Sequence, residues 1–208
     1  VPSLLLAART AAPMEGVNFR LQAATLMLDE DPARAGQILD DTPTGSAVQP
    51  AQLRRYLLLR ARVALAQSDP NLALGWLSDV RMQDIPLDQS AQVTLGLLKS
   101  DAYLLLRSYL ASARERVYIH SLLPRETQAD NIESIYATLR ELPAEVLHRA
   151  GEREITNEVR GWLSLAALAK RHQFDPARTV AELERWQGVW AGHPAATNLP
   201  RSLQILTE

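Results

Sequence analysis

The chain has no cysteine and only nine glycines among its 208 residues. Without cysteine it can form no zinc finger, thiol nucleophile or disulfide framework. The glycines are scattered, and no GxSxG, phosphate-loop or GxGxxG pattern occurs. The commonest catalytic and nucleotide-binding motifs are therefore excluded, and the lack of cysteine is compatible with an oxidising compartment.

Neither an excess of one charge nor a long apolar run is present. Lys and Arg number 22 against 24 Asp and Glu, a formal net charge of −2, which gives no electrostatic footprint for nucleic acid. The longest apolar runs, at 3–8 and 102–106, are far shorter than the roughly 20 residues of a membrane span. Residues 1–13 have no basic amino-terminal region, so we interpret them as an amphipathic helix rather than a signal peptide.

Leucine and alanine dominate what is there. The chain has 35 Leu and 30 Ala against 11 Val and 7 Ile, and these proportions favour helices over pleated sheets. The composition, 47% hydrophobic and 22% charged, is that of a folded protein. We predict an all-α fold.

Three copies of an Asp-Pro pair punctuate the sequence: Asp31-Pro32, Asp69-Pro70 and Asp175-Pro176. An Asp at the N-cap accepts a hydrogen bond from a free backbone N–H, and a Pro after it has its φ already set for a helix. Each pair therefore predicts the start of a helix.

Around each Asp the same residue types recur in register. A small residue lies eight positions before it, another small residue four positions after it, and a leucine eight positions after it: Ala23, Ala35 and Leu39; Ala61, Ala73 and Leu77; Ala167, Thr179 and Leu183. The pattern indicates a helix-turn-helix repeat whose small residues let two antiparallel helices approach closely. Such pairs bury their apolar stripes only by stacking, which predicts a tetratricopeptide-like helical-hairpin solenoid.

The remaining sequence is assigned to further helices and one loop. Residues 41–50, with two prolines and a glycine, are predicted to be a loop. No composition shift divides the chain, so we expect one domain over residues 1–208. The other predicted helices span about 88–106, a segment ending near 123, 129–142, 143–150, 154–171 and 176–191, with a short one after Pro194.

Candidate catalytic and metal-binding residues are few. The four histidines, His120, His148, His172 and His193, lack metal-site spacing, and His193 before Pro194 suits an exposed or capping role. The acidic groups at 29–31 and 40–41 could be a glycosidase pair or a calcium site, but carboxylates at helix ends more often serve as caps. We therefore predict no catalytic residue, no cofactor and no metal site.

The tryptophans and arginines leave two interpretations each. Trp186 and Trp190, one helical turn apart, could form a platform for a carbohydrate or peptide, although packing between repeats is the more usual role of Trp76, Trp162, Trp186 and Trp190. The cluster of Arg54, Arg55, Arg60 and Arg62 is interpreted as a solvated helix face rather than a phosphate site. Because the first helix of each pair lines the concave side of a solenoid, the arginines on its non-packing face are candidates to meet acidic or peptide partners: Arg20, Arg55, Arg62 and Arg171.

Several segments together resemble a known family. The order and spacing of QAATLMLDEDPARAGQIL, RYLLLRARVALAQSDPNLALGWL, GWLSLAALAKR and W…HPAATNLP are similar to the amino-terminal domain of the LppC/LpoA family. Those proteins are outer-membrane lipoproteins that activate class A penicillin-binding proteins. The resemblance covers essentially the whole chain, and its signature here is structural, so it transfers no site residue.

The resemblance implies a tetratricopeptide-like domain anchored through a lipidated cysteine outside this chain, on the periplasmic side of the outer membrane. It also implies a carboxy-terminal α/β domain that resembles periplasmic binding proteins and lies beyond residue 208. The implied partner is a class A penicillin-binding protein, and peptidoglycan is a second candidate.

Three functions follow from these observations. The first is a non-catalytic domain that spaces and docks an activator of peptidoglycan synthesis between the outer membrane and the synthase. The second is a general adaptor that binds a peptide in a concave groove. The third is the helical scaffold of a glycan-cleaving enzyme, against which the lack of a separate catalytic segment argues.

Overall fold

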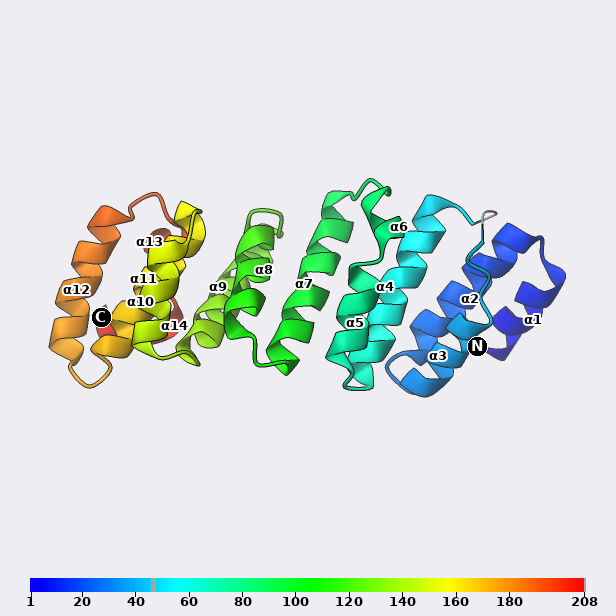
Figure 1. Cartoon of the computed structure of the whole chain (residues 1–208), viewed down its shortest axis with the longest axis horizontal. Coiled ribbons are helices and arrows are strands. Elements are labelled where there is room, and N and C mark those ends of the chain that lie inside the picture. Colours follow the sequence, from blue (N-terminus) through cyan, green and yellow to red (C-terminus); the bar gives the residue numbers. More distant parts are fainter. Residues whose placement is uncertain (46–47, 208) are drawn as a thin grey trace. The chain divides into compact units, whose positions relative to one another are not determined.

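The computed structural model describes residues 1–45 and 48–207, and over these residues the chain is helical with no strand (Figure 1). Within each of two compact units, helices pack as antiparallel hairpins that contact each other, as in tetratricopeptide repeats. The predicted all-α, tetratricopeptide-like hairpin fold is confirmed. In the described part of the chain, no helix combines the length and the apolar character that crossing a membrane demands.

The chain divides into two compact units, Val1–Leu106 and Arg107–Glu208. The expectation of one domain over residues 1–208 stays a prediction. Unit 1 contains α1 (Pro2–Thr10), α2 (Pro13–Met27), α3 (Pro32–Asp40), α4 (Pro50–Ala66), α5 (Pro70–Leu77), α6 (Val80–Gln83) and α7 (Gln89–Leu105). Unit 2 contains α8 (Tyr109–His120), α9 (Arg125–Arg140), α10 (Ala144–Arg153), α11 (Asn157–Arg171), α12 (Pro176–Val189), α13 (Pro194–Thr197) and α14 (Arg201–Thr207).

All three Asp-Pro pairs begin a helix in the predicted way. The carboxylate of Asp31 accepts a hydrogen bond from the backbone N–H of Arg34 at 2.9 Å, at the start of α3. The same bond joins Asp69 to the N–H of Leu72 (3.0 Å) and Asp175 to that of Arg178 (3.1 Å). The local signal in the sequence therefore fixes where α3, α5 and α12 begin.

The positions that recur around each Asp form the hairpin cores. All nine are buried, none more than 5% exposed: Ala23, Ala35, Leu39, Ala61, Ala73, Leu77, Ala167, Thr179 and Leu183. Small side chains on facing helices allow a short interaxial distance, and the leucine fills the space beyond the crossing. In α4, Leu57 and Ala61 are fully inaccessible.

The turn between α4 and α5 closes with a left-handed residue. The N–H of Ser68 bonds to the carbonyl oxygen of Leu65 and that of Asp69 to Ala64, the two bonds of a Schellman motif. Ser68 has φ = 60°, a region that glycine occupies at lower cost. Two successive residues, Ser68 and Asp69, therefore end α4 and cap α5.

Several helix boundaries in unit 2 differ from the predictions, and α8, for example, ends at His120 rather than near residue 123. Helix α9 begins at Arg125, directly after Pro124, rather than near residue 129. Helix α10 continues through Gly151 to Arg153, since that glycine faces α11 instead of ending the helix. Helix α11 begins at Asn157 rather than Glu154, because the Glu154 carboxylate accepts the N–H groups of the next two residues and holds them in a turn.

The short elements were the hardest to predict. Helices α6 and α14 were not predicted, because so few residues show too little periodicity, whereas the four-residue helix α13 was predicted from Pro194. Around the predicted loop at 41–50, residues 41–45 and 48–49 lie outside helices, Pro50 already begins α4, and residues 46 and 47 lie outside the described residues.

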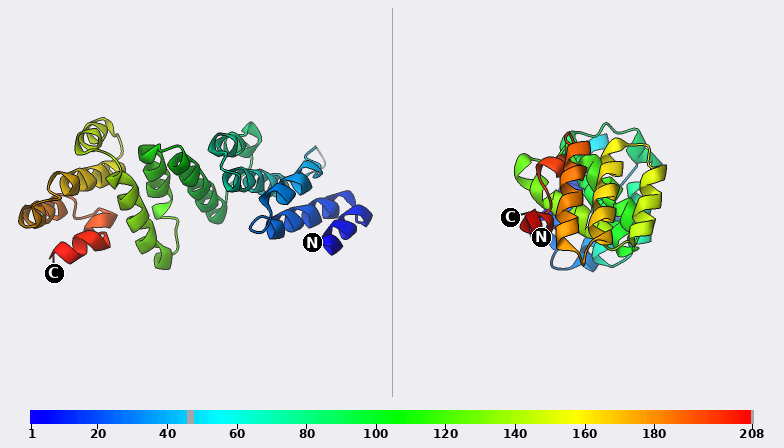
Figure 2. Two further views of the ribbon diagram at one scale, coloured as in Figure 1. Left: turned by 90° about the horizontal axis from the view of Figure 1, so that it is seen from below. Right: turned by 90° about the vertical axis from the view of Figure 1, so that its left-hand side faces the viewer.

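Helices α10, α11 and α12 form a layer in unit 2. Helix α11 packs against α10 on one side and α12 on the other. The right-hand view of Figure 2 shows the three side by side with α11 in the middle. Trp162, Leu163 and Leu165 of α11 are fully buried in the core of this unit.

Candidate functional site

The four arginines predicted to meet a partner are divided between the units. Arg20 (α2), Arg55 and Arg62 (both α4) belong to unit 1, whereas Arg171 ends α11 in unit 2. Arg20 is half-buried and the other three are exposed. Arg55 donates to the hydroxyl oxygen of Thr25 at 3.3 Å, which links α4 to α2. The structure therefore does not gather all four around one site.

Arg54 and Arg60 of the α4 cluster are half-buried, so the prediction of a solvated helix face is wrong for these two arginines. The Arg60 guanidinium lies 5.2 Å from the ring centroid of Tyr56 and 5.4 Å from that of Trp76, and it bonds to the carboxylate of Asp40. Arg54 donates to the carbonyl oxygen of Pro86 (2.8 Å) and to Asp88 (3.1 Å). Both side chains tie helices together, because a guanidinium can stack on rings and bond at its edges at the same time. Only the other two arginines of the cluster are exposed.

The acidic groups near α3 serve structural roles. Asp31 caps α3, and Asp40 pairs with the guanidinium described above. Among the residues that the structure describes, no group of three or more His, Cys, Asp or Glu side chains is placed to hold a metal ion. The capping interpretation holds for Asp31, and Asp40 is an ion-pair partner instead.

A histidine at the end of unit 2 is buried among three tryptophans. The ring of His193 makes edge contacts with those of Trp162, Trp186 and Trp190, at centroid distances of 5.3, 5.6 and 5.9 Å. Its approach to α11 requires Gly161, where a Cβ atom would lie 2.5 Å from the imidazole. His193 was predicted to be exposed or to cap a helix. It is only 5% exposed, so the first alternative is wrong, and it caps α13, so the second is confirmed.

Hydrogen bonds fix the tautomer of this histidine. Its Nε2 lies 2.8 Å from the carbonyl oxygen of Glu158, which can only accept, so Nε2 carries the proton. Nδ1 then accepts from the N–H of Ala195 at 3.2 Å. Burial lowers the pKa of His193, against the opposing effect of the bond to Glu158. The neutral ring therefore anchors α13 to α11.

The tryptophans act mainly in packing. Trp162 is fully buried, and its indole N–H has no hydrogen-bond partner among the described residues. The indole N–H of Trp186 donates to the hydroxyl of Ser164 at 2.6 Å, and the ring stacks on Trp190 at 6.3 Å. Trp190 is only partly buried and is the tryptophan whose ring lines surface hollows.

Three hollows of similar size lie around α11 in the described part of unit 2. The first, of about 630 Å³, lies between the start of α11 and the end of α12, and Glu158, Trp190 and His193 line it. Burial raises the pKa of Glu158 at its edge. The second, of about 650 Å³, lies over α11 between α10 and α12. The third, of about 640 Å³, lies where α10 begins and α11 ends.

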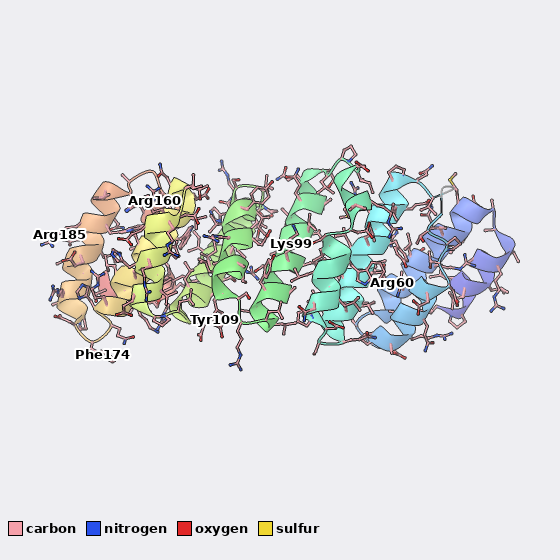
Figure 3. The ribbon with its side chains drawn as sticks, in the orientation of Figure 1. Arg60, Lys99, Tyr109, Arg160, Phe174 and Arg185 are labelled. Atoms are coloured by element: carbon pink, nitrogen blue, oxygen red, sulfur yellow. The ribbon has the colours of Figure 1, made fainter. Side chains whose placement is uncertain are left out.

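Polar groups of both kinds line these hollows. Arg160, labelled in Figure 3, extends from α11 and donates to the carbonyl oxygen of Glu154 at 2.6 Å. Glu182 of α12 pairs with Arg185 at 2.9 Å, and His148 lies 3.5 Å from Glu152 on α10. Of the four arginines predicted from the sequence, Arg171 lines two of the hollows. This arrangement can bind a ligand by charge, hydrogen bonds and stacking.

Sequence reasoning missed most of these lining residues. Ser164, Glu182 and His148 come from three helices, and no sequence motif joins them. The available signal was the spacing of Arg160, Ser164 and Arg171, which fall on one stripe of a helix with period 3.6. That stripe could have marked one face of α11 as unpacked.

Fold and site together define a helical-hairpin repeat protein with surface hollows around α11. The model of the family described as "LppC putative lipoprotein" matches residues 3–208. The chain therefore belongs to the LppC family.

Relatives of this family are named for activation of penicillin-binding proteins. The chain is 20% identical over 202 residues to the penicillin-binding protein activator LpoA of Photobacterium profundum, covering 97% of this chain and 33% of the relative. It is 26% identical over 170 residues to the protein of the same name from Dickeya chrysanthemi, covering 82% of this chain and 24% of the relative. The chain thus spans a third or less of the length of these curated relatives.

Solved structures share the fold. LpoA of Haemophilus influenzae superposes with a TM-score of 0.77 at 18% identity, covering 100% of this chain and 38% of that one. The amino-terminal domain of E. coli LpoA gives a TM-score of 0.74 at 23% identity, covering 98% and 89%. At these identities the likeness establishes the hairpin architecture.

Proposed function

We propose that this chain is the amino-terminal domain of a lipoprotein that activates a class A penicillin-binding protein. In this proposal it is a non-catalytic module that spaces and docks the activator between the outer membrane and the peptidoglycan synthase. The observation that carries the proposal is the family match over residues 3–208 together with relatives named as activators. A carboxy-terminal α/β domain and a lipidated cysteine on the periplasmic side of the outer membrane belong to the same proposal.

The surface supports a binding role over a catalytic one. Catalysis by acid and base requires a positioned pair of titratable groups within reach of a substrate. The buried histidine at the tryptophan cluster is instead held neutral by two backbone groups. Exposed Arg55, Arg62 and Arg171, with half-buried Arg20, are the proposed contacts for the partner protein.

The test is to mix the purified chain with a class A penicillin-binding protein from the same organism and, separately, with isolated peptidoglycan. We expect saturable association with the synthase and no release of soluble glycan fragments. Release of fragments would establish the glycan-cleaving alternative. Binding of peptides without any binding of the synthase would favour the general adaptor.

A second arm localises the contact. Variants Arg55→Glu and Arg62→Glu should weaken association with the synthase at least fivefold, because an opposite charge at an interface repels the acidic partner surface. Arg9→Glu, a charge reversal at another exposed arginine of unit 1, is the matched control. Equal affinities of all three variants would remove these arginines from the contact.

A further inference from the structure

A smaller hollow of unit 2 lies apart from the start of α11, where four helices meet. Its volume is about 130 Å³, and α9, α11, α12 and α14 all contribute to its walls. A single water molecule needs only about 10–15 Å³ of such space, so a group larger than water fits. We call this site the α9–α14 hollow, and its lining includes Tyr136, Arg140, Lys170, Gln173 and Ser202.

The charged side chains that line the α9–α14 hollow are cationic. They are Arg140 at the end of α9 and Lys170 at the end of α11, and no Asp or Glu lies among the described lining residues. The three larger hollows differ, because each has at least one glutamate in its lining. The charge of this smaller site therefore favours an anion.

Carboxylates on α9 near this hollow are engaged by another residue. Glu133 accepts a hydrogen bond from the backbone N–H of Arg201, and Asp130 lies 3.7 Å from the guanidinium of the same residue. No ion pair joins Arg140 or Lys170 to a carboxylate of the part of the chain that the structure describes. The two lining cations are therefore not neutralised within the chain.

The Arg140 guanidinium is held in place while its N–H groups stay available. It lies 5.7 Å from the ring centroid of Tyr136, a cation–π contact between residues one helical turn apart. No hydrogen bond joins the guanidinium to a described residue, and none joins it to Glu141, the next residue in the chain. A guanidinium on a ring keeps its planar fork of donors for oxygen atoms of a ligand.

Lys170 also has donors to spare. Its ammonium group donates to the carbonyl oxygen of Arg140 at 2.8 Å, and such a bond offsets the partial negative charge at the end of α9. An ammonium group has three N–H donors, so two remain. Two cations that line one small hollow repel each other, and a bound anion would relieve that repulsion.

Hydroxyl groups lie beside the two cations. Tyr136 is only 4% exposed, and its hydroxyl bonds to that of Ser202 on α14. Burial raises the pKa of Tyr136, so the phenol keeps its proton. One of the two hydroxyl protons makes the bond between them, and the other is left for an oxygen atom of a ligand.

We propose that the α9–α14 hollow binds a phosphate group, with Arg140 and Lys170 on its charged oxygens and a hydroxyl of Tyr136 or Ser202 beside them. A phosphate group on an ester carries about −1.5 to −2 charges at neutral pH and has three acceptor oxygens, so it can engage both cations and a hydroxyl together. A carboxylate has a single charge and two oxygens, and would leave part of the lining unpaired. The proposal does not rest on docking to a synthase.

The test is a titration of the intact chain with inorganic phosphate, glycerol phosphate or acetate at constant ionic strength, followed by the NMR shifts of the backbone amides. We expect saturable changes on α9, α11 and α14, and phosphate should bind about tenfold more tightly than acetate, because it engages both cations. Binding of glycerol phosphate as well would assign the site to a phosphate group on a larger molecule. Binding of inorganic phosphate alone would assign it to the free ion. Equal affinity for phosphate and acetate, or changes that do not saturate, would overturn the proposal.

Two variants locate the site. Arg140→Gln and Lys170→Gln should each weaken phosphate binding about tenfold, since each removes a hydrogen bond to a charged group. Arg153→Gln changes an exposed arginine at the end of α10 and should bind phosphate as the unaltered chain does. The same spectra show whether each variant is folded. If Lys170→Gln unfolds the chain, Arg140→Gln still decides, because its guanidinium has no described hydrogen bond to lose. Equal phosphate affinity in the Arg140 and Arg153 variants would contradict the proposal.

Discussion

His193 shows how one side chain can hold two helices together. It is buried against three tryptophan rings, bonds to the backbone of α11 through Nε2 and caps α13 through Nδ1. Its place next to α11 exists only because residue 161 is glycine. The contact therefore depends on a residue that has no side chain.

Replacing that glycine tests the contact. In Gly161→Ala, the new Cβ atom would meet the imidazole at 2.5 Å, so we expect a loss of about 2 kcal/mol in the free energy of unfolding. The matched control is Gly188→Ala in α12, where no heavy atom lies within 4 Å of the added Cβ. The Gly188→Ala variant should gain about 0.5–1 kcal/mol in the free energy of unfolding, because alanine is favoured over glycine within a helix. Urea unfolding measures both, and two changes of the same sign would contradict the packing described.

Mild acid should destabilise unit 2 through its buried histidines. Burial lowers the pKa of His193 and of His120 below the ordinary value of about 6.5 that they regain on unfolding. The unfolded chain therefore takes up protons first as pH falls. Stability is complete above the unfolded pKa and declines as pH drops through 6.5 towards the folded values.

The measurement is the free energy of unfolding between pH 7.5 and 5.5. We expect a decrease over that interval, which lies above the range where most carboxylates titrate. His148→Gln removes an exposed histidine and should keep the pH dependence. A flat profile, or one abolished by this control variant, would show that the buried rings are not responsible.

At the level of helices, the Asp-Pro pairs set the starts of α3, α5 and α12. Asp69→Ala and Asp175→Ala should each cost about 1 kcal/mol, since each leaves a backbone N–H without its cap. Asp41→Ala, at the C-cap of α3 where an acid has no capping role, should leave stability nearly unchanged. Thermal unfolding of the three variants checks this, and an equal effect of all three would argue against specific capping.

Much of the hairpin pattern could be read from the sequence because its causes are local. The N-caps and the small residues eight before and four after each Asp act within one hairpin. The small residues proved buried, whereas the N-cap aspartates are exposed. The hollows around α11 could not be predicted in the same way. His148, Ser164 and Glu182 converge only after three helices pack. The contact of Arg60 likewise depends on the ring of Trp76 in the next helix.

For the chain as a whole, stacking of hairpins predicts a single cooperative unfolding transition over residues 1–208, as for one domain. Leu57→Ala removes a fully buried side chain in unit 1 and should cost about 2–5 kcal/mol. In a Trp76→Phe background, fluorescence reports only the three tryptophans of unit 2. In this background, the Leu57 substitution should also lower the unfolding midpoint that the tryptophans of unit 2 report. An unchanged midpoint would mean that the units unfold independently.

The most direct test of the proposed spacing and docking role is to compare the longer lipoprotein inferred above with a version lacking residues 1–208. Transpeptidation by the purified class A synthase is measured with each protein, and growth is measured in cells that depend on the activator. If the domain spaces and docks a separate activating domain, the shortened protein should still stimulate the purified synthase but fail to support growth. Complete loss of stimulation in the purified system, or full growth without the domain, would contradict this account.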